Sequence, residues 1–425
     1  MRVLLVVKSM MMENLGVMYL SSVIKKGGHE CRIVDMGFTV GNIVEWVPDI
    51  IGYSIMTGDQ LRFQKINDVV LHAIKVYGNG KPKIIVGGPD PTFFPEGYDW
   101  ADEICKGEGE NWINKFLTKD NYATYDNIDE IPWPDRTSFP NMKIRDVISS
   151  RGCSYGKCGY CYNSAWEKMF PDIPKLRIRK AQDVVNEIAS IKPIPEFVYF
   201  QDATFGTSIK WLKEFSQKYK SQVNIPYHAH LRPNQITEER VRLLHESNCV
   251  SVKIALETAS DRLRTLINRG DANNEDVLFA ARLLKENKIV LILQNILGLP
   301  SSTIEEDLAT LEINIECKPG YAWSSIFQPY PMTDLAMLCE KEGYYTGNYS
   351  EIGDNFFDKS ILNFTSEHKE WIACLQRVFA FCVEMQVLPK INDLTWNNLP
   401  KFIHNTMRKV GDKRMFPNID LTKLL

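Results

Sequence analysis

Three cysteines stand close together in the stretch SSRGCSYGKCGYCYN, at Cys153, Cys158 and Cys161, with the spacing C-x4-C-x2-C. Two thiols can form a disulfide, and four can close a tetrahedral zinc site. Three thiols instead suggest a metal centre with one coordination position left open. A [4Fe–4S] cluster with an open iron, a zinc site with an open position and a loop without metal are all compatible with this spacing.

The overall composition offers no strong electrostatic partner. The chain has 425 residues, 44% of them hydrophobic, and a net charge of -3. This balance gives no reason to expect nucleic acid or an anionic membrane as a partner. No secretory signal and no apolar run of about 20 residues is visible, so we expect a cytoplasmic protein. Thiols stay reduced there, and the other seven cysteines are expected to be small core residues.

The elements that must position the cysteines begin with a repeated β-α-β pattern over residues 1–117. Apolar strand patterns such as RVLLVV and KIIVGG alternate with helical patterns such as GVMYLSSVIKK and QLRFQKINDVVLHAIKVYG. This order predicts a doubly wound, Rossmann-like α/β domain with a parallel sheet. Ligands of such sheets lie beyond the carboxyl ends of the strands, which singles out the loops 8–15, 54–60 and 87–96.

The remaining chain divides into three parts. Residues 118–145 contain Pro132, Pro134 and Pro140 in polar sequence and are expected to form an extended linker. Residues 146–334 contain six strand patterns with amphipathic segments between them, which predicts a partial (βα)6 TIM-type barrel with its chemistry at the carboxyl ends of the strands. We expect the cysteine loop to follow the first of these strands directly. Residues 335–425 are expected to form a helical C-terminal cap domain.

The segment RGCSYGKCGYC resembles the cluster-binding signature of the radical S-adenosylmethionine superfamily, whose usual spacing is C-x3-C-x2-C. This chain has one extra residue between Cys153 and Cys158. The resemblance continues through VYFQDATF, VKIALET and LGLPSST, and it implies a [4Fe–4S] cluster held by the three cysteines. The contacts to S-adenosylmethionine that it implies are Tyr160, Arg179, Gln201, Asp202, Arg232, Glu257 and Gly298.

Several of these residues have a simpler structural interpretation. Glu257 ends an apolar strand, where an unpaired carboxylate would be costly, so we expect it to accept hydrogen bonds from the ligand rather than to cap a helix. Asp202 could cap the next helix. Arg179 and Arg232 could form ion pairs rather than clamp a carboxylate. Gly298 could allow close approach of the adenine or belong to a plain turn.

The N-terminal domain resembles the cobalamin-binding domain of the B12-dependent branch of this superfamily. VGGPDPTFFPE and KGEGE match the glycine-rich segments of that branch, and NLGVMYLSSVIKKGGHECRIVD matches its opening βαβ unit. The cobalamin contacts that the resemblance implies are Ser54, Met56, Thr57, Gly58, Gly87, Gly88, Pro89, Gly107, Glu108, Gly109 and Glu110.

The expected cobalamin site departs from the common pattern at cobalt. B12-binding domains commonly supply a histidine to cobalt from a DxHxxG motif after the first strand. Here that loop reads KSMMMENLG and contains no histidine. His29 follows the first helix, where we expect a turn residue. We therefore expect no histidine on the lower face of cobalt, which would face residues 54–60.

The resemblance implies a C-methyltransferase that acts on an unactivated carbon and takes electrons from an external donor. One S-adenosylmethionine would methylate cobalamin, and a second would yield a 5′-deoxyadenosyl radical that removes hydrogen from the substrate. A non-methylating oxidoreductase or cyclase of the same branch is the first alternative. A zinc or iron–sulfur protein without catalysis is the second.

The substrate is expected to be a peptide or protein side chain or a small molecule. The two-part layout with a short cap resembles enzymes that modify peptides, for example the glutamine C-methyltransferase that acts on methyl-coenzyme M reductase. A small antibiotic precursor or a lipid is the alternative. Tyr321 and Tyr330 lie near the last strand of the expected barrel and are candidate substrate contacts.

Overall fold

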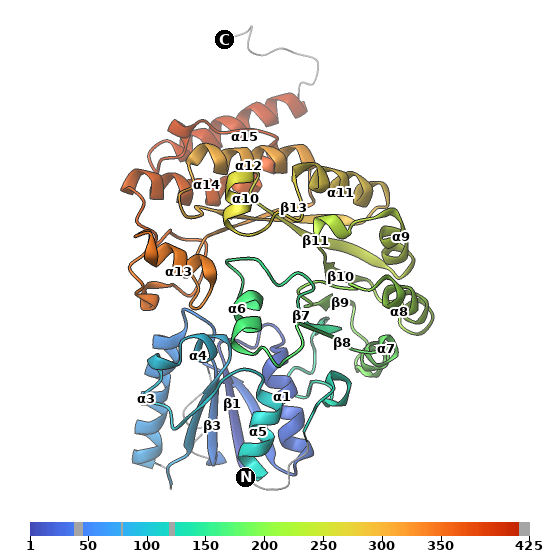
Figure 1. Ribbon diagram of the computed structural model, residues 1–425, viewed down its shortest axis with the longest axis vertical. Helices are drawn as coiled ribbons and strands as arrows, with labels where there is room; N and C mark the ends of the chain where they lie inside the picture. Colours follow the sequence, from blue (N-terminus) through green and yellow to red (C-terminus); the bar gives the residue numbers. More distant parts are fainter. Residues whose placement is uncertain (38–45, 78–79, 119–123, 416–425) are drawn as a thin grey trace.

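In the computed structural model, two α/β halves lie one above the other along the longest axis, with a helical region at the far end (Figure 1). The structure describes residues 1–37, 46–77, 80–118 and 124–415. Residues 119–123 of the expected linker and 416–425 of the expected cap lie outside the described residues. No helix in the described ranges combines the length and the apolar character that crossing a membrane requires.

The N-terminal half is a five-stranded parallel sheet covered by helices. Its elements are β1 (Arg2–Val7), α1 (Leu15–Lys26), β2 (Glu30–Asp35), β3 (Ile50–Ser54), α3 (Gln60–Tyr77), β4 (Lys83–Gly87), α4 (Pro89–Phe93), β5 (Glu103–Cys105) and α5 (Gly109–Thr118). The strand order is β2-β1-β3-β4-β5. Alternate residues of β1 serve opposite faces: Val3 and Leu5 pack with α1 and α5, and Leu4 packs with α3. The predicted doubly wound domain is confirmed.

The second half is an open six-stranded parallel sheet. Its elements are β6 (Ile144–Val147), α7 (Ala181–Ser190), β9 (Phe197–Phe200), α8 (Ile209–Gln222), β10 (Tyr227–His230), α9 (Glu238–Glu246), β11 (Cys249–Glu257), α10 (Asp261–Leu266), α11 (Asn274–Glu286), β12 (Val290–Leu297), α12 (Ile304–Cys317) and β13 (Tyr321–Ile326). The order is β13-β12-β11-β10-β9-β6. Val198 and Val252 pack with α7, α8, α9 and α11 on the outer face. This is the predicted partial barrel.

A small ribbon separates the cysteine loop from the barrel strands. β7 (Ser150–Gly152) pairs antiparallel with β8 (Leu176–Ile178). The prediction that the loop directly follows the first barrel strand is therefore wrong, because Ser150–Gly152 leaves the main sheet to pair with β8. The loop leads into α6 (Tyr162–Met169), which Figure 1 shows between the two halves.

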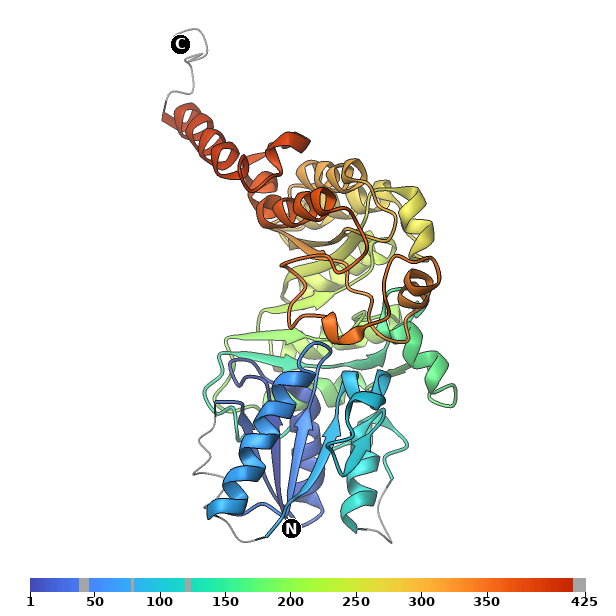
Figure 2. The ribbon, with the colours of Figure 1, turned by 90° about the vertical axis from the view of Figure 1, so that its left-hand side faces the viewer.

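The C-terminal region is helical, as predicted, and it packs on the edge of the barrel. It contains α13 (Asp334–Lys341), α14 (Ser366–Met385) and α15 (Leu399–Met415). Leu375 and Phe379 of α14 share one apolar cluster with Leu311 of α12 and Ile326 of β13. Figure 2 shows α15 extending away from the barrel. Short 3-10 turns lie at Pro95–Gly97, Ile128–Glu130, Pro233–Gln235, Tyr349–Glu351 and Ile391–Asp393.

A buried ionic network joins the two halves. Glu13, in the loop after β1, accepts hydrogen bonds from Nη1 of Arg136 at 2.5 Å and from Nη1 of Arg145 at 2.7 Å. It also accepts one from the backbone N–H of Asp146 at 2.8 Å. The side chain of Arg145 is fully buried. Since a buried charge needs a partner, Glu13 fixes the first loop of the N-terminal half against the start of the barrel.

Candidate functional site

The three clustered cysteines lie on one loop between β7 and α6. Cys153 follows β7, and Cys161 is the N-cap residue of α6. All three are free thiols. Burial raises the pKa of Cys158 and raises that of Cys161 to about 11, and the neighbouring thiols act in the same direction. The three sulfur atoms are therefore close enough to influence one another electrostatically.

A guanidinium group faces this loop. Nη1 of Arg269 donates to Sγ of Cys158 at 3.8 Å, and Nη2 donates to the backbone oxygen of Ala255 at 3.0 Å. A cation beside a thiol favours the thiolate, which is the form that binds metal. Sequence analysis missed Arg269, because a single arginine in the stretch INRGD forms no motif with the distant cysteines.

The donor set fits an iron–sulfur cluster better than a structural zinc site. Within the part of the chain that the structure describes, no three His, Cys, Asp or Glu side chains are arranged to hold a single metal ion. Zinc sites take tetrahedral sets that commonly include histidine. Three thiols on an irregular loop are ligands that a [4Fe–4S] cluster takes, with one iron left for another ligand. Binding requires the buried thiols to lose their protons.

Glu257 lies at the end of β11, next to the cysteine loop. Its backbone has φ +63°, and a register shift in β11 precedes it. The hydroxyl of Tyr160, from the cysteine loop, donates to Oε1 of Glu257, and Nη1 of Arg269 lies 4.0 Å from the same oxygen. Oε2 is buried without a hydrogen-bond partner. A buried carboxylate oxygen without a donor is costly, so this oxygen fits a ligand that brings donors of its own.

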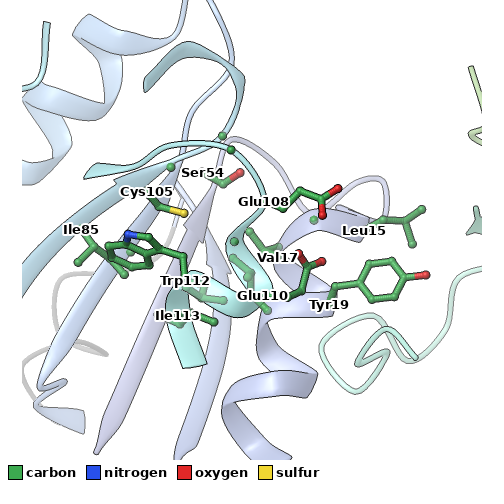
Figure 3. A pocket seen from close by; sticks show the side chains of 18 of the residues that line it. Leu15, Val17, Tyr19, Ser54, Ile85, Cys105, Glu108, Glu110, Trp112 and Ile113 are labelled. Carbon is green, nitrogen blue, oxygen red and sulfur yellow. The ribbon is translucent and has the colours of Figure 1, made fainter. Parts of the chain in front are cut away.

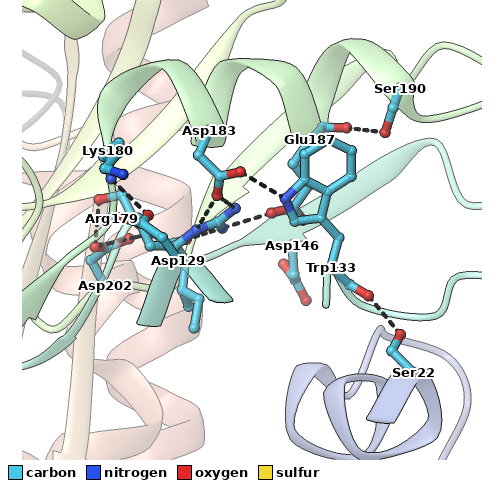
Figure 4. Close-up of polar contacts among 12 residues, drawn as sticks. Ser22, Asp129, Trp133, Asp146, Arg179, Lys180, Asp183, Glu187, Ser190 and Asp202 are labelled. Atoms are coloured by element: carbon cyan, nitrogen blue, oxygen red, sulfur yellow. Dashed lines mark hydrogen bonds and ion pairs between the residues drawn. The ribbon is translucent and has the colours of Figure 1, made fainter. Parts of the chain in front are cut away.

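Two of the residues expected to contact S-adenosylmethionine have structural partners instead. The carboxylate of Asp202 accepts hydrogen bonds from the hydroxyls of Ser149 and Ser150 at 2.7 and 2.5 Å. Arg179 donates to Asp183 and Glu187 of α7, at 2.6 Å each (Figure 4). Asp202 therefore anchors the strand that leads to Cys153, and Arg179 belongs to an ion-pair network.

The other three residues expected to contact S-adenosylmethionine lie near the carboxyl ends of the barrel strands. Gln201 is exposed, and its amide donates to Oδ1 of Asp146 at 3.1 Å. Arg232 lies over the ring of Tyr155, 4.0 Å from its centroid, and forms an ion pair with Asp271. Gly298 has φ +65°, which suits glycine, and its N–H donates to Asp307 at 3.0 Å.

A cavity of about 290 Å³ opens at the carboxyl ends of β1, β3, β4 and β5, where the doubly wound fold places ligands. Figure 3 shows side chains from α1, β4 and α5 around it. Ile148 and Arg151 of the second half complete the wall. Leu15, at the end of the predicted ligand loop 8–15, lines the cavity, and the lining residues that the sequence did not single out include Val17, Tyr19, Ile85, Cys105, Trp112 and Ile113. Such a mainly apolar cavity suits an apolar part of an organic ligand.

The expected cobalamin contacts divide into two sets. Those that line the cavity are Ser54, Gly87, Gly88, Gly107, Glu108, Gly109 and Glu110. Those that do not line it are Met56, Thr57, Gly58 and Pro89. Gly88 has φ +106°, and a Cβ atom there would lie 2.7 Å from the backbone oxygen of Ile55. Only glycine fits at this position, where two loops of the cavity mouth touch.

The two glutamates of the GEGE segment connect the cavity to the cysteine strand. Glu108 forms ion pairs with Arg177 and, at 3.4 Å, with Arg151. Glu110 accepts hydrogen bonds from both terminal nitrogens of Arg151, the shorter at 2.5 Å. Arg151 lies on β7, two residues before Cys153, and lines the cavity. One side chain thus fixes the distance between the cavity and the cysteine loop.

Comparison with known families assigns both halves. The B12 binding domain family matches residues 1–117, and the radical SAM superfamily matches residues 147–312. The chain belongs to the cobalamin-dependent radical S-adenosylmethionine enzymes. Its cofactors are therefore a [4Fe–4S] cluster, S-adenosylmethionine and cobalamin, as the sequence motifs predicted.

Individual relatives of this radical SAM enzyme support the same family. It is 25% identical over 365 residues to the uncharacterized methyltransferase PH0819 of Pyrococcus horikoshii, covering 76% of this chain and 77% of that protein. It is 21% identical over 434 residues to the cytidylyl-2-hydroxyethylphosphonate methyltransferase of Streptomyces wedmorensis, covering 78% of each. The predicted radical SAM enzyme of the methyltransferase type is confirmed at the level of the family.

Solved structures share the fold of this enzyme. The cobalamin-dependent S-adenosylmethionine radical enzyme OxsB, solved with aqua-cobalamin and S-adenosylmethionine, matches with a TM-score of 0.61 and 18% identity over 86% of this chain. The chain spans 58% of the length of OxsB. The methyltransferase TsrM from Kitasatospora setae, solved with tryptophan, matches with a TM-score of 0.63 and 15% identity, covering 80% of this chain and 76% of TsrM.

Two further features of the enzyme bear on the lower face of cobalt. His29 precedes β2, and its Nδ1 lies 3.3 Å from the N-terminal amine, so it stands at the amino edge of the sheet, opposite the cavity. Gly58, in the loop expected to face cobalt, has φ +92°, and a Cβ there would lie 2.1 Å from the backbone oxygen of Gly353. The C-terminal region therefore covers this loop. A cobalt without a histidine ligand stays a prediction.

The two tyrosines proposed as substrate contacts lie at different levels of the barrel. Tyr330 follows β13 at its carboxyl end and is half-buried, which raises the pKa of its hydroxyl. Tyr321 is the first residue of β13 and is 50% exposed. Chemistry in such barrels occurs at the carboxyl ends of strands, so Tyr330 is the better placed of the two.

Proposed function

We propose that this enzyme transfers a methyl group to an unactivated carbon of its substrate. The observation that carries the proposal is the connection through Arg151, which joins the wall of the cavity to the strand that precedes Cys153. This connection holds the mainly apolar cavity beside the three-thiol loop, between the two parallel sheets. Methyl transfer to a substrate radical requires that the cobalamin site and the cluster site adjoin one substrate.

Different residues of this chain would bind the cluster and orient S-adenosylmethionine. Cys153, Cys158 and Cys161 would hold the cluster, and Glu257 with Tyr160 would orient S-adenosylmethionine. When bound, these cofactors supply the electron, the hydrogen-abstracting 5′-deoxyadenosyl group and the methyl group. The protein supplies position and exclusion of water.

The test is the product balance of the reconstituted enzyme. Protein loaded with iron, sulfide and hydroxocobalamin would be incubated anaerobically with S-adenosylmethionine, a low-potential reductant and candidate substrates. We expect S-adenosylhomocysteine and 5′-deoxyadenosine in about equal amounts for each methylation. The Cys158→Ala variant should give neither methylated product nor deoxyadenosine. Deoxyadenosine with a changed substrate but without S-adenosylhomocysteine would refute methyl transfer.

That second outcome would support a cyclase or oxidoreductase of the same branch. The supporting observation is a 26% identity over 243 residues to the anaerobic magnesium-protoporphyrin IX monomethyl ester cyclase of Rubrivivax gelatinosus, which covers 56% of this chain and 39% of that protein. The same product measurement distinguishes the two activities.

The proposal also extends to the chemical class of the substrate. We infer that the methylated carbon lies on a peptide or protein side chain, for which the glutamine of methyl-coenzyme M reductase is one candidate, or on a small molecule. The two-part layout with a short helical region beyond the barrel resembles that of enzymes that modify peptides, which supports a peptide. Incubation with labelled methyl donor and with either peptides or small acids would separate the two classes.

A further inference from the structure

The inner face of the barrel carries polar side chains that the cofactor sites do not use. Val198 of β9, Ala229 of β10 and Val252 of β11 pack in the outer core with the helices. Successive side chains of a strand point to opposite faces, so the neighbours of these residues point into the barrel. The inward-facing residues are Tyr199, His228, His230, Ser251 and Lys253.

Tyr199 is the centre of this cluster. Its hydroxyl lies 3.0 Å from Nε2 of His230 and accepts a hydrogen bond from Nζ of Lys253 at 3.2 Å. The ring of His228 packs against the ring of Tyr199, with their centroids 4.5 Å apart. Nδ1 of His228 lies 2.7 Å from the hydroxyl of Ser251. Three neighbouring strands thus bring one cation and several donors to one place.

The ammonium group of Lys253 lies between aromatic side chains of the barrel. Among the described residues, no carboxylate pairs with its ammonium group, whose contacts are the hydroxyl of Tyr199 and the face of Trp323 at 5.5 Å. Two of its three N–H donors are left for a ligand. Burial lowers the pKa of Lys253, a cost that a bound anion would offset. Asp146 is the neighbour of Tyr199 on the adjacent strand. Its carboxylate accepts a hydrogen bond from the amide of Gln201 and forms no ion pair with Lys253.

The histidines add hydrogen-bonding groups rather than charge. Burial, with the nearby charge of Lys253, lowers the pKa of His228 to about 4 and that of His230 to about 3. Both rings are therefore neutral near pH 7. His228 is 1% exposed, and its Nε2 is buried without a hydrogen-bond partner. A buried polar atom without a partner calls for an additional ligand group.

An aromatic wall stands beside the cluster. Trp323 of β13 lies 5.4 Å from Phe357 between ring centroids, and Phe357 lies 4.6 Å from Phe356. Both phenylalanines belong to the C-terminal region, which brings them to the open edge of the barrel. The wall offers contact to the apolar part of a substrate whose charge lies at Lys253.

We propose that Lys253, with Tyr199, His228 and Trp323, forms a subsite that binds an acidic group of the substrate, either a carboxylate or a phosphoryl group. The inference rests on the proposed function, because methyl transfer requires a substrate bound in the barrel. Lys253 precedes Glu257 by four residues, roughly 13 Å along the strand. The acidic group would thus anchor the substrate away from its reacting carbon. An acidic peptide side chain and a small organic acid both meet this description.

Binding of small aromatic acids to the full chain tests the subsite without turnover. The probes are phenylacetate, phenylphosphonate and the neutral phenylacetamide, followed by saturation-transfer NMR on wild type, Lys253→Met and Lys253→Arg. We expect at least one acid to bind wild type tenfold or more tightly than the amide. Lys253→Met should lose this preference, and Lys253→Arg should keep most of it. The acid that binds more tightly identifies the carboxylate or the phosphoryl group.

Two further variants test whether acid binding depends on the subsite around Lys253. Lys213→Met removes an exposed lysine that pairs with Glu239, and it should leave the acid preference unchanged. Tyr199→Phe gives a second variant of the subsite and should weaken acid binding severalfold. Equal binding of acid and amide to wild type, or unchanged acid binding in Lys253→Met, would overturn the proposal. Neither result depends on product formation, so failure of methyl transfer would be seen separately.

Discussion

At the scale of single residues, the cysteine loop is held in place by residues that are not themselves expected metal ligands. Cys158 is held by Arg269, and Tyr160 of the same loop bonds to Glu257 at the end of β11. Contacts from the end of β11 and from the segment after α10 thus hold the cysteine loop. The extra residue between Cys153 and Cys158 lies in this irregular segment, and ligation by Cys153 stays a prediction.

Replacing each clustered cysteine by alanine tests this ligand set. We expect iron in the reconstituted protein to fall from about four atoms per chain to well below one in Cys153→Ala, Cys158→Ala and Cys161→Ala, because two remaining protein thiolates are too few to retain the whole cluster. Iron and sulfide assays and the visible absorbance measure the loss. Cys317→Ala, a buried cysteine of α12, is the control and should keep its iron. Full iron in Cys153→Ala would show that the longer spacing removes Cys153 from the cluster.

Asp146 gives a pH-dependent prediction. Burial raises its pKa from 3.8 to about 6, with Glu13 adding to the rise and Arg136 opposing it. The folded state therefore holds the proton more tightly than the unfolded state, and this contribution to stability is complete below pH 3.8 and lost as the pH rises through 6. Asp146→Asn should gain stability relative to wild type between pH 4 and 7, by about 1 to 3 kcal/mol. Denaturant titrations across this range measure it, and a constant difference would contradict it.

At the scale of elements, the cavity is made by strands that end together and by helices that begin beside them. β1, β3, β4 and β5 present their carboxyl ends at one edge, and α1 and α5 start there. Gly52 of β3 adds no side chain to the space between Leu5 and Ile85, and all three residues line the cavity. A small residue in the middle of the sheet therefore sets the depth of the cavity.

Filling that space should exclude cobalamin. In Gly52→Val, the new Cβ would lie 2.9 Å from Cδ2 of Leu5 and 3.2 Å from Cγ1 of Ile85. We expect cobalamin retained after desalting to fall at least tenfold, with a loss of stability of about 1 to 3 kcal/mol from overpacking. Gly270→Ala is the control, because nothing lies within 4 Å of a Cβ there. Normal cobalamin content in a folded Gly52→Val protein would show that the cofactor lies elsewhere.

At the scale of the whole molecule, buried ion pairs join the two halves. Glu13 meets Arg136 and Arg145, and Glu108 and Glu110 meet Arg177 and Arg151. Glu13 belongs to KSMMMENLG, the loop in which B12-binding domains commonly carry their cobalt histidine. In this chain the loop is used to dock the barrel.

Removing Glu13 should weaken this docking strongly. Glu13→Ala leaves the buried guanidinium of Arg145 without its carboxylate, and breaking such a pair costs about 3 to 5 kcal/mol. The midpoint of urea denaturation and the rate of proteolysis between the halves measure the effect. The exposed pair of Lys83 and Glu103 is the control, since Lys83→Ala should cost about 1 kcal/mol or less. Equal losses in both variants would contradict a role for Glu13 in docking.

The sequence by itself determined the order of elements and the identity of the cofactors. Apolar strands in alternation with amphipathic helices encode both parallel sheets, because side-chain periodicity is a local property. The cysteine motif and the glycine-rich segments are also local in the chain. Through their resemblance to known signatures, they imply the [4Fe–4S] cluster, S-adenosylmethionine and cobalamin.

Only the tertiary structure decided which polar residues are free to meet a ligand. Asp202 and Arg179 find protein partners, whereas Glu257 keeps an unbonded oxygen beside Arg269, a residue without any motif. Lys253, Tyr199 and Trp323 come from three strands, and their meeting depends on sheet order and register. Pairing across a sheet joins residues far apart in the chain, so a linear pattern cannot reveal which charges are already balanced.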